Sequence, residues 1–350
     1  MLMYGSFCAA IAGLLIYRLP REKWAFFFEK LVLDIKYNIL ANKEIFLDKL
    51  YAKNNVKVKT CQQGRVAVIT GGARGIGFNV VKMLLELDME VVIACRSITA
   101  GNDAISKIRE TGIITGRAKV YHLDNCSLTS VRNCANEIKR DYQAIHVLIN
   151  NAGIMFCPYR ETEDGHEQQW VVNYLAHFLF TSLLSPLLKA GGLPGQSSRI
   201  VNVTSCAHIL GEIYFDDINH KNRFLSPAAY AQSKLAQVVF TKKLQDLLEE
   251  RGSNVQVYSV HPGIVNTDLF EHSYLRKYQP LFSYLFKTPE EGAIPIVYTA
   301  LSSALEEQGG AYISNCRSAS VNPLALSLKI QDQLFQLSLA QVNLSNFFQT

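Results

Sequence analysis

The chain has 350 residues, of which 49% are hydrophobic and 19% are charged. A chain this long and this apolar is not disordered, and it can bury the core of one large domain or two small ones. The net charge of only +5, from 35 basic and 30 acidic residues, argues against a nucleic-acid-binding protein, which would cluster its basic residues.

The cysteines are scattered along the sequence, and none of them forms a C-x-x-C pair. The spacing typical of zinc sites and of thioredoxin-like motifs is therefore missing, and we expect no metal. The scatter instead indicates reduced thiols, mostly small core residues, in a protein that faces the cytosol.

Residues 2–17 contain no charged side chain, and Arg18, Arg21 and Lys23 follow them. A helix over residues 1–17 is about 25 Å long, at the lower limit for a membrane span. A cleaved signal peptide is disfavoured because no basic residue precedes the apolar run, and a core helix is disfavoured because the run lies outside the main domain. We therefore predict a membrane anchor, with the basic cluster and the bulk of the chain in the cytosol.

Residues 18–63 form a second segment with a different pattern. Apolar side chains recur there at helical spacing, at Trp24, Phe27, Phe28, Leu31, Ile35 and Ile39. The pattern predicts a helix that either packs on the domain or lies on the membrane surface beside the anchor. Residues 51–63 are polar and are predicted to be a linker.

A strand, a glycine-rich loop and a helix open the main domain. The apolar run at 65–70 predicts a buried parallel strand, and a helical pattern follows residue 77. Between them, the sequence GGARGIG contains Gly71, Gly75, Ile76 and Gly77. Such a loop lets backbone N–H groups and the positive end of the helix dipole approach a pyrophosphate. The arrangement predicts a dinucleotide site.

The second predicted strand, at 90–95, is followed by Arg96 and not by an acid. In dinucleotide folds an Asp or Glu at this edge binds the ribose 2′-hydroxyl, whereas Arg accommodates a 2′-phosphate. Arg74, just before the second glycine of the loop, is a second cation near the same place. Because two guanidinium groups suit a phosphate, the pair predicts NADP(H) in preference to NAD(H).

Strands and helices then alternate, with further strands predicted at 118–123, 146–150, 199–205, 254–260 and 311–314. The alternation predicts an α/β fold: a Rossmann-type doubly wound parallel sheet of about seven strands, in a single domain with an N-terminal membrane-anchor extension. Asp124 directly follows the third strand, where we expect it to contact the adenine.

Six motifs occur in a fixed order: TGGARGIG (70–77), NNAG (150–153), VVNYLAHF (171–178), VTS (203–205), YAQSK (230–234) and HPGIVNT (261–267). With them the chain resembles the short-chain dehydrogenase/reductase superfamily over about residues 64–315, and within it the membrane-anchored retinol dehydrogenase-like group. The resemblance implies NAD(P)-dependent interconversion of an alcohol and a carbonyl, and it leaves a homodimer open.

The family's catalytic roles carry over onto four positions. The resemblance implies that Tyr230 is the general acid/base, and Lys234 lies one helical turn further on the same face. Lys234 is expected to lower the pKa of Tyr230 toward working pH and to bind the nicotinamide ribose. Ser205 is expected to hydrogen-bond the substrate oxygen, with Thr204 as the alternative hydroxyl. Asn173 is expected to hold a water in the proton relay to Lys234.

The resemblance also completes the predicted cofactor site. It implies that Gly263 and Thr267 cradle the nicotinamide and its phosphates, whereas His261 is a packed loop residue. Asn151 is expected to hydrogen-bond backbone between the fourth and fifth strands, beside the cofactor.

The family's substrate loops correspond to residues 206–228 and 268–286, which are rich in Leu, Ile, Phe and Tyr. An apolar lid favours a small apolar, lipid-like substrate such as a retinoid, sterol, polyprenoid or fatty aldehyde. Alternatively, these loops simply pack on the sheet or lie on the membrane.

The predicted organisation is a membrane anchor at 1–17, an amphipathic helix and linker at 18–63, the catalytic domain at 64–315 and a C-terminal extension of unassigned role at 316–350. The favoured location is the endoplasmic reticulum membrane, with the domain facing the cytosol, and a chain that starts near Lys59 is expected to be soluble. Two alternatives are a catalytically silent binding or scaffold protein, which would not need the four catalytic residues, and a secreted protein with a cleaved signal.

Overall fold

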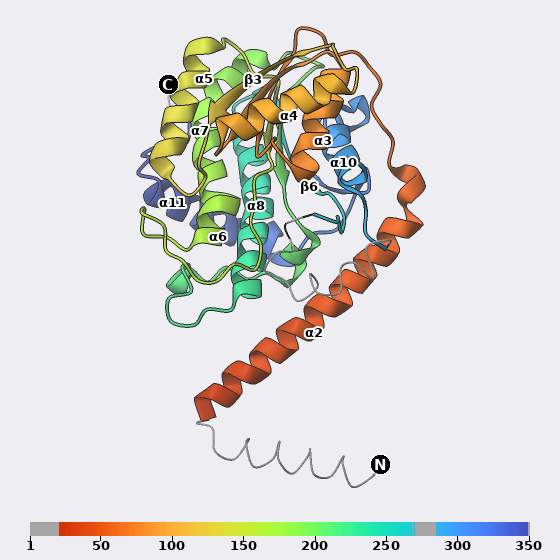
Figure 1. Cartoon of the computed structure of the whole chain (residues 1–350). Coiled ribbons are helices and arrows are strands. Elements are labelled where there is room, and N and C mark those ends of the chain that lie inside the picture. The colour runs from red at the N-terminus through yellow and green to blue at the C-terminus, as the bar shows by residue number, and fades with distance from the viewer. Residues whose placement is uncertain (1–20, 268, 270–284, 349–350) are drawn as a thin grey trace.

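The computed structural model describes residues 21–267, 269 and 285–348, so the predicted anchor and residues 270–284 of the second predicted substrate loop lie outside the described residues. A sheet in the order β3-β2-β1-β4-β5-β6-β7-β8 forms the centre of the molecule (Figure 1). All pairs are parallel except β7 with β8. The strands are β1 (Val66–Thr70), β2 (Glu90–Cys95), β3 (Arg117–His122), β4 (Val147–Asn150), β5 (Ser198–Val203), β6 (Val255–His261), β7 (Tyr312–Ser314) and β8 (Arg317–Ser318).

The predicted doubly wound α/β fold is confirmed, and each of the seven predicted strands appears within two residues of its expected position. The added strand, β8, spans only Arg317–Ser318 and pairs with the edge of the sheet. A strand of this length is too short to show the alternation that a sequence pattern requires.

Helices cover both faces of the sheet, as buried parallel strands demand. Side chains that alternate along β1 point to opposite cores: Val68 packs with α5, α7, α8 and α11, whereas Ala67 and Ile69 pack with α3, α4 and α10. The helices of the domain are α3 (Gly75–Glu86), α4 (Ile98–Glu110), α5 (Leu128–Asp141), α6 (Gln168–Trp170), α7 (Ala176–Gly191), α8 (Ser226–Glu249), α10 (Pro289–Leu301) and α11 (Leu328–Gln341), and a π-helical turn, η2 (Val171–Leu175), joins α6 to α7. Short 3-10 turns lie at η1 (Ala52–Asn54), η3 (Cys206–Leu210), η4 (Phe215–Asp217), η7 (Ser303–Leu305) and η8 (Pro323–Leu326).

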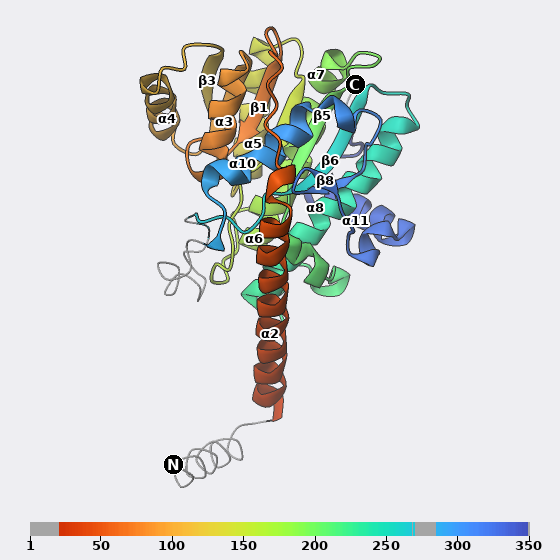
Figure 2. The ribbon, with the colours of Figure 1, turned by 90° about the vertical axis from the view of Figure 1, so that its right-hand side faces the viewer.

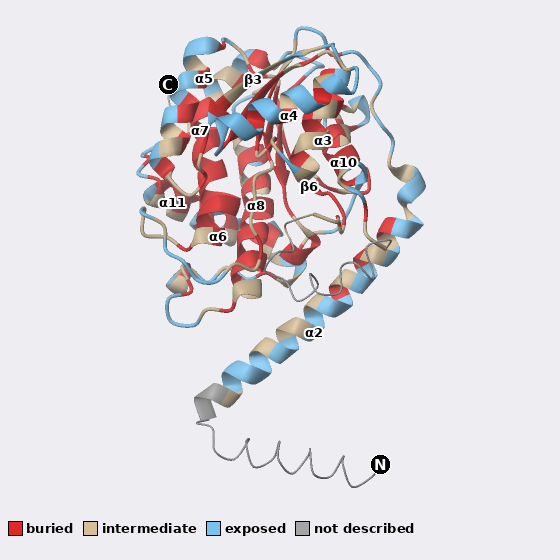
Figure 3. Cartoon of the chain, in the orientation of Figure 1, coloured by how far each residue is buried: buried red, intermediate tan, exposed pale blue. Residues whose placement is uncertain are grey.

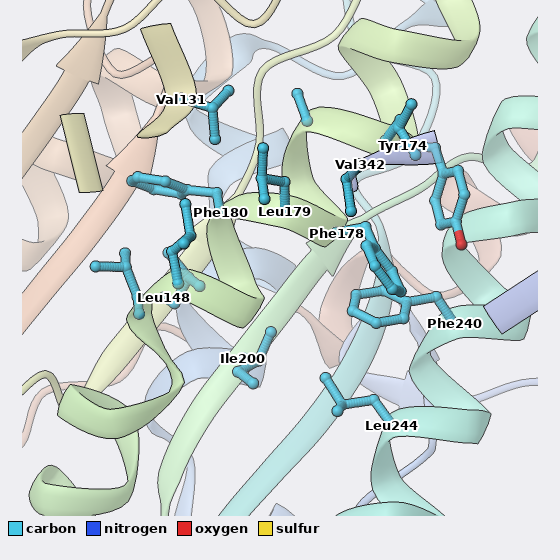
Figure 4. Close-up of a cluster of buried hydrophobic side chains, with 14 of the residues drawn as sticks. Val131, Leu148, Tyr174, Phe178, Leu179, Phe180, Ile200, Phe240, Leu244 and Val342 are labelled. Atoms are coloured by element: carbon cyan, nitrogen blue, oxygen red, sulfur yellow. The ribbon is translucent and has the colours of Figure 1, made fainter. Parts of the chain in front are cut away.

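The C-terminal segment, expected to be an extension beyond the domain, packs into one of these cores (Figure 4). Phe347 is buried and its ring lies 5.1 Å from that of Phe178. The hydroxyls of Tyr174 and Ser338 are 2.6 Å apart, which joins α11 to η2, the turn before α7. Residues 316–348 are therefore an integral part of the fold.

The predicted N-terminal helix is present as α2 (Arg21–Leu50), a single long helix whose C-terminal part lies against the domain and whose N-terminal part extends away from it (Figures 1 and 2). Its predicted apolar face is not the face that packs, because Phe27, Phe28, Leu31, Ile35 and Ile39 are exposed (Figure 3). The domain is instead contacted by a face of mixed polarity, made by Tyr37, Leu40, Glu44 and Asp48. Packing on the domain through the apolar face is thus excluded for these residues.

Within the described part of the chain, one helical stretch is long and apolar enough to cross a membrane, at Gln168–Gly191. Its most apolar 18-residue window is 83% buried inside the protein, and the stretch forms α6, η2 and α7, so it is a core element of the domain. The cysteines of the described ranges are all free thiols, as the sequence predicted.

Candidate active site

The glycine-rich loop joins β1 to α3 in a conformation that needs its glycines. Gly71 has a φ of 72° and Gly75 a φ of 58°, in the left-handed region that side chains disfavour. A Cβ on Gly77 would lie 2.2 Å from the Gly71 carbonyl oxygen, so close packing of helix and strand also requires glycine there. A Cβ on Gly75 would meet only the Thr267 Cγ2 atom, at 3.8 Å. The loop after β6, which includes Thr267, therefore lies next to the glycine loop.

Asn151 contacts the glycine loop, but from a different strand than expected. Its side-chain amide donates to the carbonyl oxygens of Thr70, at 2.9 Å, and Gly71, at 3.2 Å. The sheet order places β4 between β1 and β5, and it is Asn150 that bonds Asn202 of β5, at 2.8 Å. The expectation that Asn151 links the fourth and fifth strands is therefore wrong: Asn151 links the fourth strand to the first and fixes the start of the glycine loop.

The two predicted phosphate-binding arginines lie at the carboxyl ends of neighbouring parallel strands, β1 and β2. Arg74 and Arg96 are both exposed, so their guanidinium groups are available to a ligand at this edge. Ile76 is half-buried and packs on the core beneath the loop. Asp124, after β3, accepts a hydrogen bond from the Cys126 backbone N–H at 2.9 Å, which holds its carboxylate at the same edge.

The predicted catalytic side chains meet between α8 and the end of β5. Tyr230 and Lys234 share one face of α8, and both are buried. The Lys234 ammonium donates to the Val203 carbonyl oxygen at 3.0 Å and lies 5.8 Å from the centre of the Tyr230 ring. The Ser205 side chain lies within hydrogen-bonding reach of the Tyr230 hydroxyl. Thr204 is not available as the alternative hydroxyl, because it donates to the Lys234 carbonyl oxygen at 2.8 Å.

The ionisation of the pair differs from the sequence-based expectation. Burial raises the pKa of Tyr230 above its ordinary value, and the hydrogen bond from Ser205 opposes this only in part. Burial also lowers the pKa of Lys234 to about 8. The expected lowering of the Tyr230 pKa by Lys234 is therefore not found, and desolvation is the largest cause of the shift.

Asn173 lies in the π-helical turn η2, a local geometry frequent at functional sites, and is fully buried. Its side chain accepts from the Ile154 N–H at 2.8 Å and donates to the Ile154 carbonyl and to the Ser233 hydroxyl. These bonds fasten the segment after β4 to the catalytic helix. A Cβ on Gly153 would lie 3.2 Å from the Asn173 Oδ1 atom and 3.5 Å from the Lys234 ammonium, so the two side chains flank the same glycine.

An apolar wall packs against Tyr230. Met155 and Ala207 pack on Tyr230, and Tyr37, Phe156 and Leu269 complete the cluster. Leu269 begins the second predicted substrate loop, whereas Tyr37 and Phe156 were not singled out in the sequence. The Phe156 φ of 57° is a rare value for a bulky residue, and no short pattern in the sequence marks it.

The loop after β6 places the last predicted cofactor residues. Gly263 has a φ of 99°, and the loop continues to Thr267 beside Gly75. His261 ends β6, is buried, and has its pKa lowered to about 4 by that burial. This environment agrees with the expectation of a packed histidine, neutral at physiological pH.

The cradle has the form that a dinucleotide requires. The N-terminus of α3 carries no acidic residue in its first turn, and its N-cap side chain makes no capping hydrogen bond, so its N–H groups are open to an anion. The cradle lies at the carboxyl edge of the sheet, between β1 and β4, where the strand order reverses and ligands of such folds bind.

Comparisons with known proteins give concordant results. The family model for short chain dehydrogenase matches residues 65–277. A polyprenol dehydrogenase from Homo sapiens is 41% identical over 277 residues, which is 78% of this chain and 84% of that protein. Retinol dehydrogenase 12 from Homo sapiens is 38% identical over 291 residues, covering 83% of this chain and 90% of that protein. A crystal structure of an uncharacterized protein from Mycobacterium Paratuberculosis is 30% identical with a TM-score of 0.65, covering 81% of this chain and 96% of its own.

Proposed function

Because this chain belongs to the short-chain dehydrogenase family, whose members are NAD(P)(H)-dependent oxidoreductases acting on CH–OH groups, we propose that it interconverts a carbonyl and an alcohol on an apolar lipid with NADP(H). The observation that carries the proposal is the meeting of Ser205, Tyr230 and Lys234 between α8 and the end of β5, next to apolar side chains. A scaffold protein would have no need of this arrangement.

In the proposed reaction the cofactor transfers the hydride and side chains of the protein transfer the proton. The nicotinamide, when bound, supplies or accepts the hydride. Tyr230 transfers the proton to or from the substrate oxygen, and Ser205 hydrogen-bonds that oxygen as its charge develops. The Lys234 ammonium stabilises the phenolate that Tyr230 becomes after it has given its proton.

The raised pKa of Tyr230 keeps the proton on its hydroxyl at neutral pH, which is the form that a carbonyl oxygen needs from an acid during reduction. Oxidation of an alcohol starts from the phenolate and reduction ends on it, so the cost that burial adds to the phenolate acts in both directions. The direction is therefore set by the cofactor, and the proposed use of NADP(H) favours reduction.

The rate of reduction is expected to fall as the pH rises through about 8. Lys234, with its pKa lowered to about 8, is an ammonium below that pH and a neutral amine above it, so the charge that stabilises the phenolate is lost. The profile of kcat against pH at saturating substrate measures this. Lys234→Arg, whose guanidinium stays charged, is expected to be slower overall but flat across this range. A flat profile for the unaltered protein, or the same decline in Lys234→Arg, would show that Lys234 is not the group responsible.

The substrate class follows from the apolar wall and from the relatives. The two relatives described above are named for polyprenol and retinol, both long apolar alcohols. Met155, Phe156 and Leu269 around Tyr230 offer such a chain apolar contacts in this protein. Assays with NADPH and a panel of retinal, a polyprenal, a fatty aldehyde and a short polar aldehyde test this, and the polar aldehyde is expected to be the poorest substrate. Preference for the polar aldehyde would contradict the proposal.

We also propose that the protein is held on the endoplasmic reticulum membrane with its catalytic domain in the cytosol. Residues 2–17 are uncharged and cations follow them, and α2 adds exposed apolar side chains at Phe27, Phe28 and Leu31. A helix with such a face can lie in the interface beside an inserted segment.

The membrane proposal predicts that the full chain pellets with microsomes and resists alkaline carbonate, and that added protease cleaves its domain in sealed microsomes. Deletion of residues 1–17 is expected to release most of the protein into the carbonate supernatant, because the inserted segment is gone. Replacement of Phe27, Phe28 and Leu31 by Ser in the deleted chain is expected to lower the remaining binding to vesicles further. Protection of the domain from protease would place it in the lumen and reverse the topology.

A further inference from the structure

Helix α2, which the sequence predicted to pack on the domain or to lie on the membrane surface, contacts the proposed catalytic centre at two places. Its middle packs against η3, the turn that follows Ser205. Its C-terminal end reaches the loop after β6, which includes Gly263 and Ile264. The two contacts lie on the substrate side and on the cofactor side of the proposed site.

The substrate-side contact is made by Tyr37. Its hydroxyl donates to the carbonyl oxygen of Pro227, in the first turn of α8, at 2.8 Å. Its ring stands edge-on to Phe156, with the ring centres 5.4 Å apart, and Phe156 stands edge-on to Tyr230 at 5.5 Å. Burial raises the pKa of Tyr37 far above its ordinary value, and the nearby Tyr230 contributes to this, so Tyr37 stays a neutral hydroxyl. Tyr37 thus closes one side of the apolar wall.

The cofactor-side contact is a buried ion pair. Asp48 and Lys287 are both buried, and the Lys287 ammonium lies 2.9 Å from the Asp48 carboxylate. The carboxylate also accepts from the Ile264 N–H at 2.9 Å and from the Asn315 amide at 3.0 Å. Lys287 in turn donates to the Asn315 side-chain oxygen at 2.7 Å and to the Pro262 carbonyl oxygen at 3.3 Å. Asp48 and Lys287 therefore hydrogen-bond the backbone on either side of Gly263, at Ile264 and at Pro262.

Gly263 shows how tightly this pair holds the loop. A Cβ there would lie 2.6 Å from the Lys287 side chain and 2.8 Å from the Asp48 carboxylate, so the pair fills the space that a side chain would need. The Lys287 backbone also bonds Ile264 and Asn266 of the same loop. A buried ion pair is a poor source of stability, because desolvation offsets its attraction, but its directed hydrogen bonds fix the backbone they reach.

We propose that α2 is a wall of the catalytic centre, in which Asp48, paired with Lys287, is a positioning residue for the loop 261–267 and Tyr37 bounds the substrate site beside Tyr230. The inference rests on the proposed function, since it takes this loop as the one that holds the nicotinamide. It also means that a chain starting near Lys59 keeps the catalytic residues but loses part of the site. The same helix, α2, thus carries the exposed apolar face proposed to lie on the membrane and the residues that border the catalytic centre.

The cofactor arm of the test is a titration of the full-length protein with NADPH, followed by fluorescence, so it does not depend on turnover. Asp48→Asn is expected to weaken NADPH binding about tenfold, which corresponds to about 1.4 kcal/mol, within the range of one charged hydrogen bond. Asp34→Asn is the matched control, because Asp34 forms an ion pair with Lys30 on the same helix, far less buried. This control is expected to leave the affinity unchanged.

A second variant separates loop positioning from stability. Asp48→Asn with Lys287→Met removes both charges, so the melting temperature is expected to recover toward that of the unaltered protein while NADPH binding stays weak. Normal NADPH affinity in this folded double variant would overturn the inference. Failure of the unaltered protein to bind NADPH or NADH would overturn the proposed function, and this inference with it.

The substrate arm uses Tyr37→Ala, with Ile39→Ala as the control because Ile39 is exposed on the same helix. Tyr37→Ala is expected to raise KM for a long apolar aldehyde by about tenfold, the scale of a lost apolar contact, with the affinity for NADPH unchanged. Tyr37→Phe keeps the ring and is expected to stay close to the unaltered protein. An unchanged KM in Tyr37→Ala, or an equal rise in Ile39→Ala, would contradict the role of Tyr37.

Discussion

Replacement of Tyr230 by Phe is expected to lower the turnover of a carbonyl substrate by at least ~100-fold, the lower end of what a general acid contributes. The change removes the transferable proton and leaves the ring in its contact with Phe156. The loss should therefore fall on kcat, with the affinity for NADPH kept. Steady-state kinetics and an NADPH titration on the same preparation measure both quantities.

Tyr159→Phe is the matched control for this substitution, because Tyr159 is an exposed tyrosine whose hydroxyl donates to the Glu161 carboxylate at 3.4 Å. It is expected to turn over at the rate of the unaltered protein. Near-normal turnover in Tyr230→Phe would mean that another group delivers the proton, and the proposed mechanism would fall.

Replacement of Arg74 and Arg96 together by Gln is expected to weaken NADPH binding by about 100-fold, the combined scale of two charge-assisted hydrogen bonds to a phosphate. Both side chains are exposed at the carboxyl edge of the sheet, so neither change disturbs the core. NADH, which lacks the 2′-phosphate, should lose far less affinity. Titration of the unaltered protein and the double variant with both cofactors gives the ratio of NADPH to NADH affinity, which shows whether the two arginines bind the 2′-phosphate.

Arg117→Gln serves as the control for lost positive charge, because Arg117 is exposed at the start of β3, on the opposite edge of the sheet. Its affinity for both cofactors is expected to stay normal. Equal losses for NADPH and NADH in the double variant would show that the arginines do not read the 2′-phosphate.

The local parts of this account could be predicted from the sequence. A buried strand followed by Gly71, Gly75 and Gly77 has few structural outcomes, and the backbone angles at Gly71 and Gly75 show why glycine is needed there. Likewise, two residues four apart on a helix must share a face, which brings Tyr230 and Lys234 together.

The parts that depend on packing could not be predicted in the same way. Asp48 and Lys287 lie far apart in the sequence and meet only when α2 lies against the loop after β6. The face of α2 that packs on the domain is of mixed polarity. The helical spacing of apolar residues in the sequence therefore marks the other face, which is exposed. The pKa of Tyr230 depends on how fully the folded chain removes it from water, which no spacing of residues reveals.

The central claim is that this protein transfers a hydride between a nicotinamide and the carbonyl carbon of an apolar lipid, with the proton passing through Tyr230. The most direct measurement uses NADPH that carries deuterium at the transferable position, with a long apolar aldehyde as substrate. The account predicts an alcohol product with deuterium on the carbon that bears the hydroxyl, and a strongly reduced yield of it with Tyr230→Phe. An alcohol without deuterium, or no alcohol from any apolar aldehyde under conditions where NADPH is bound, would contradict the account.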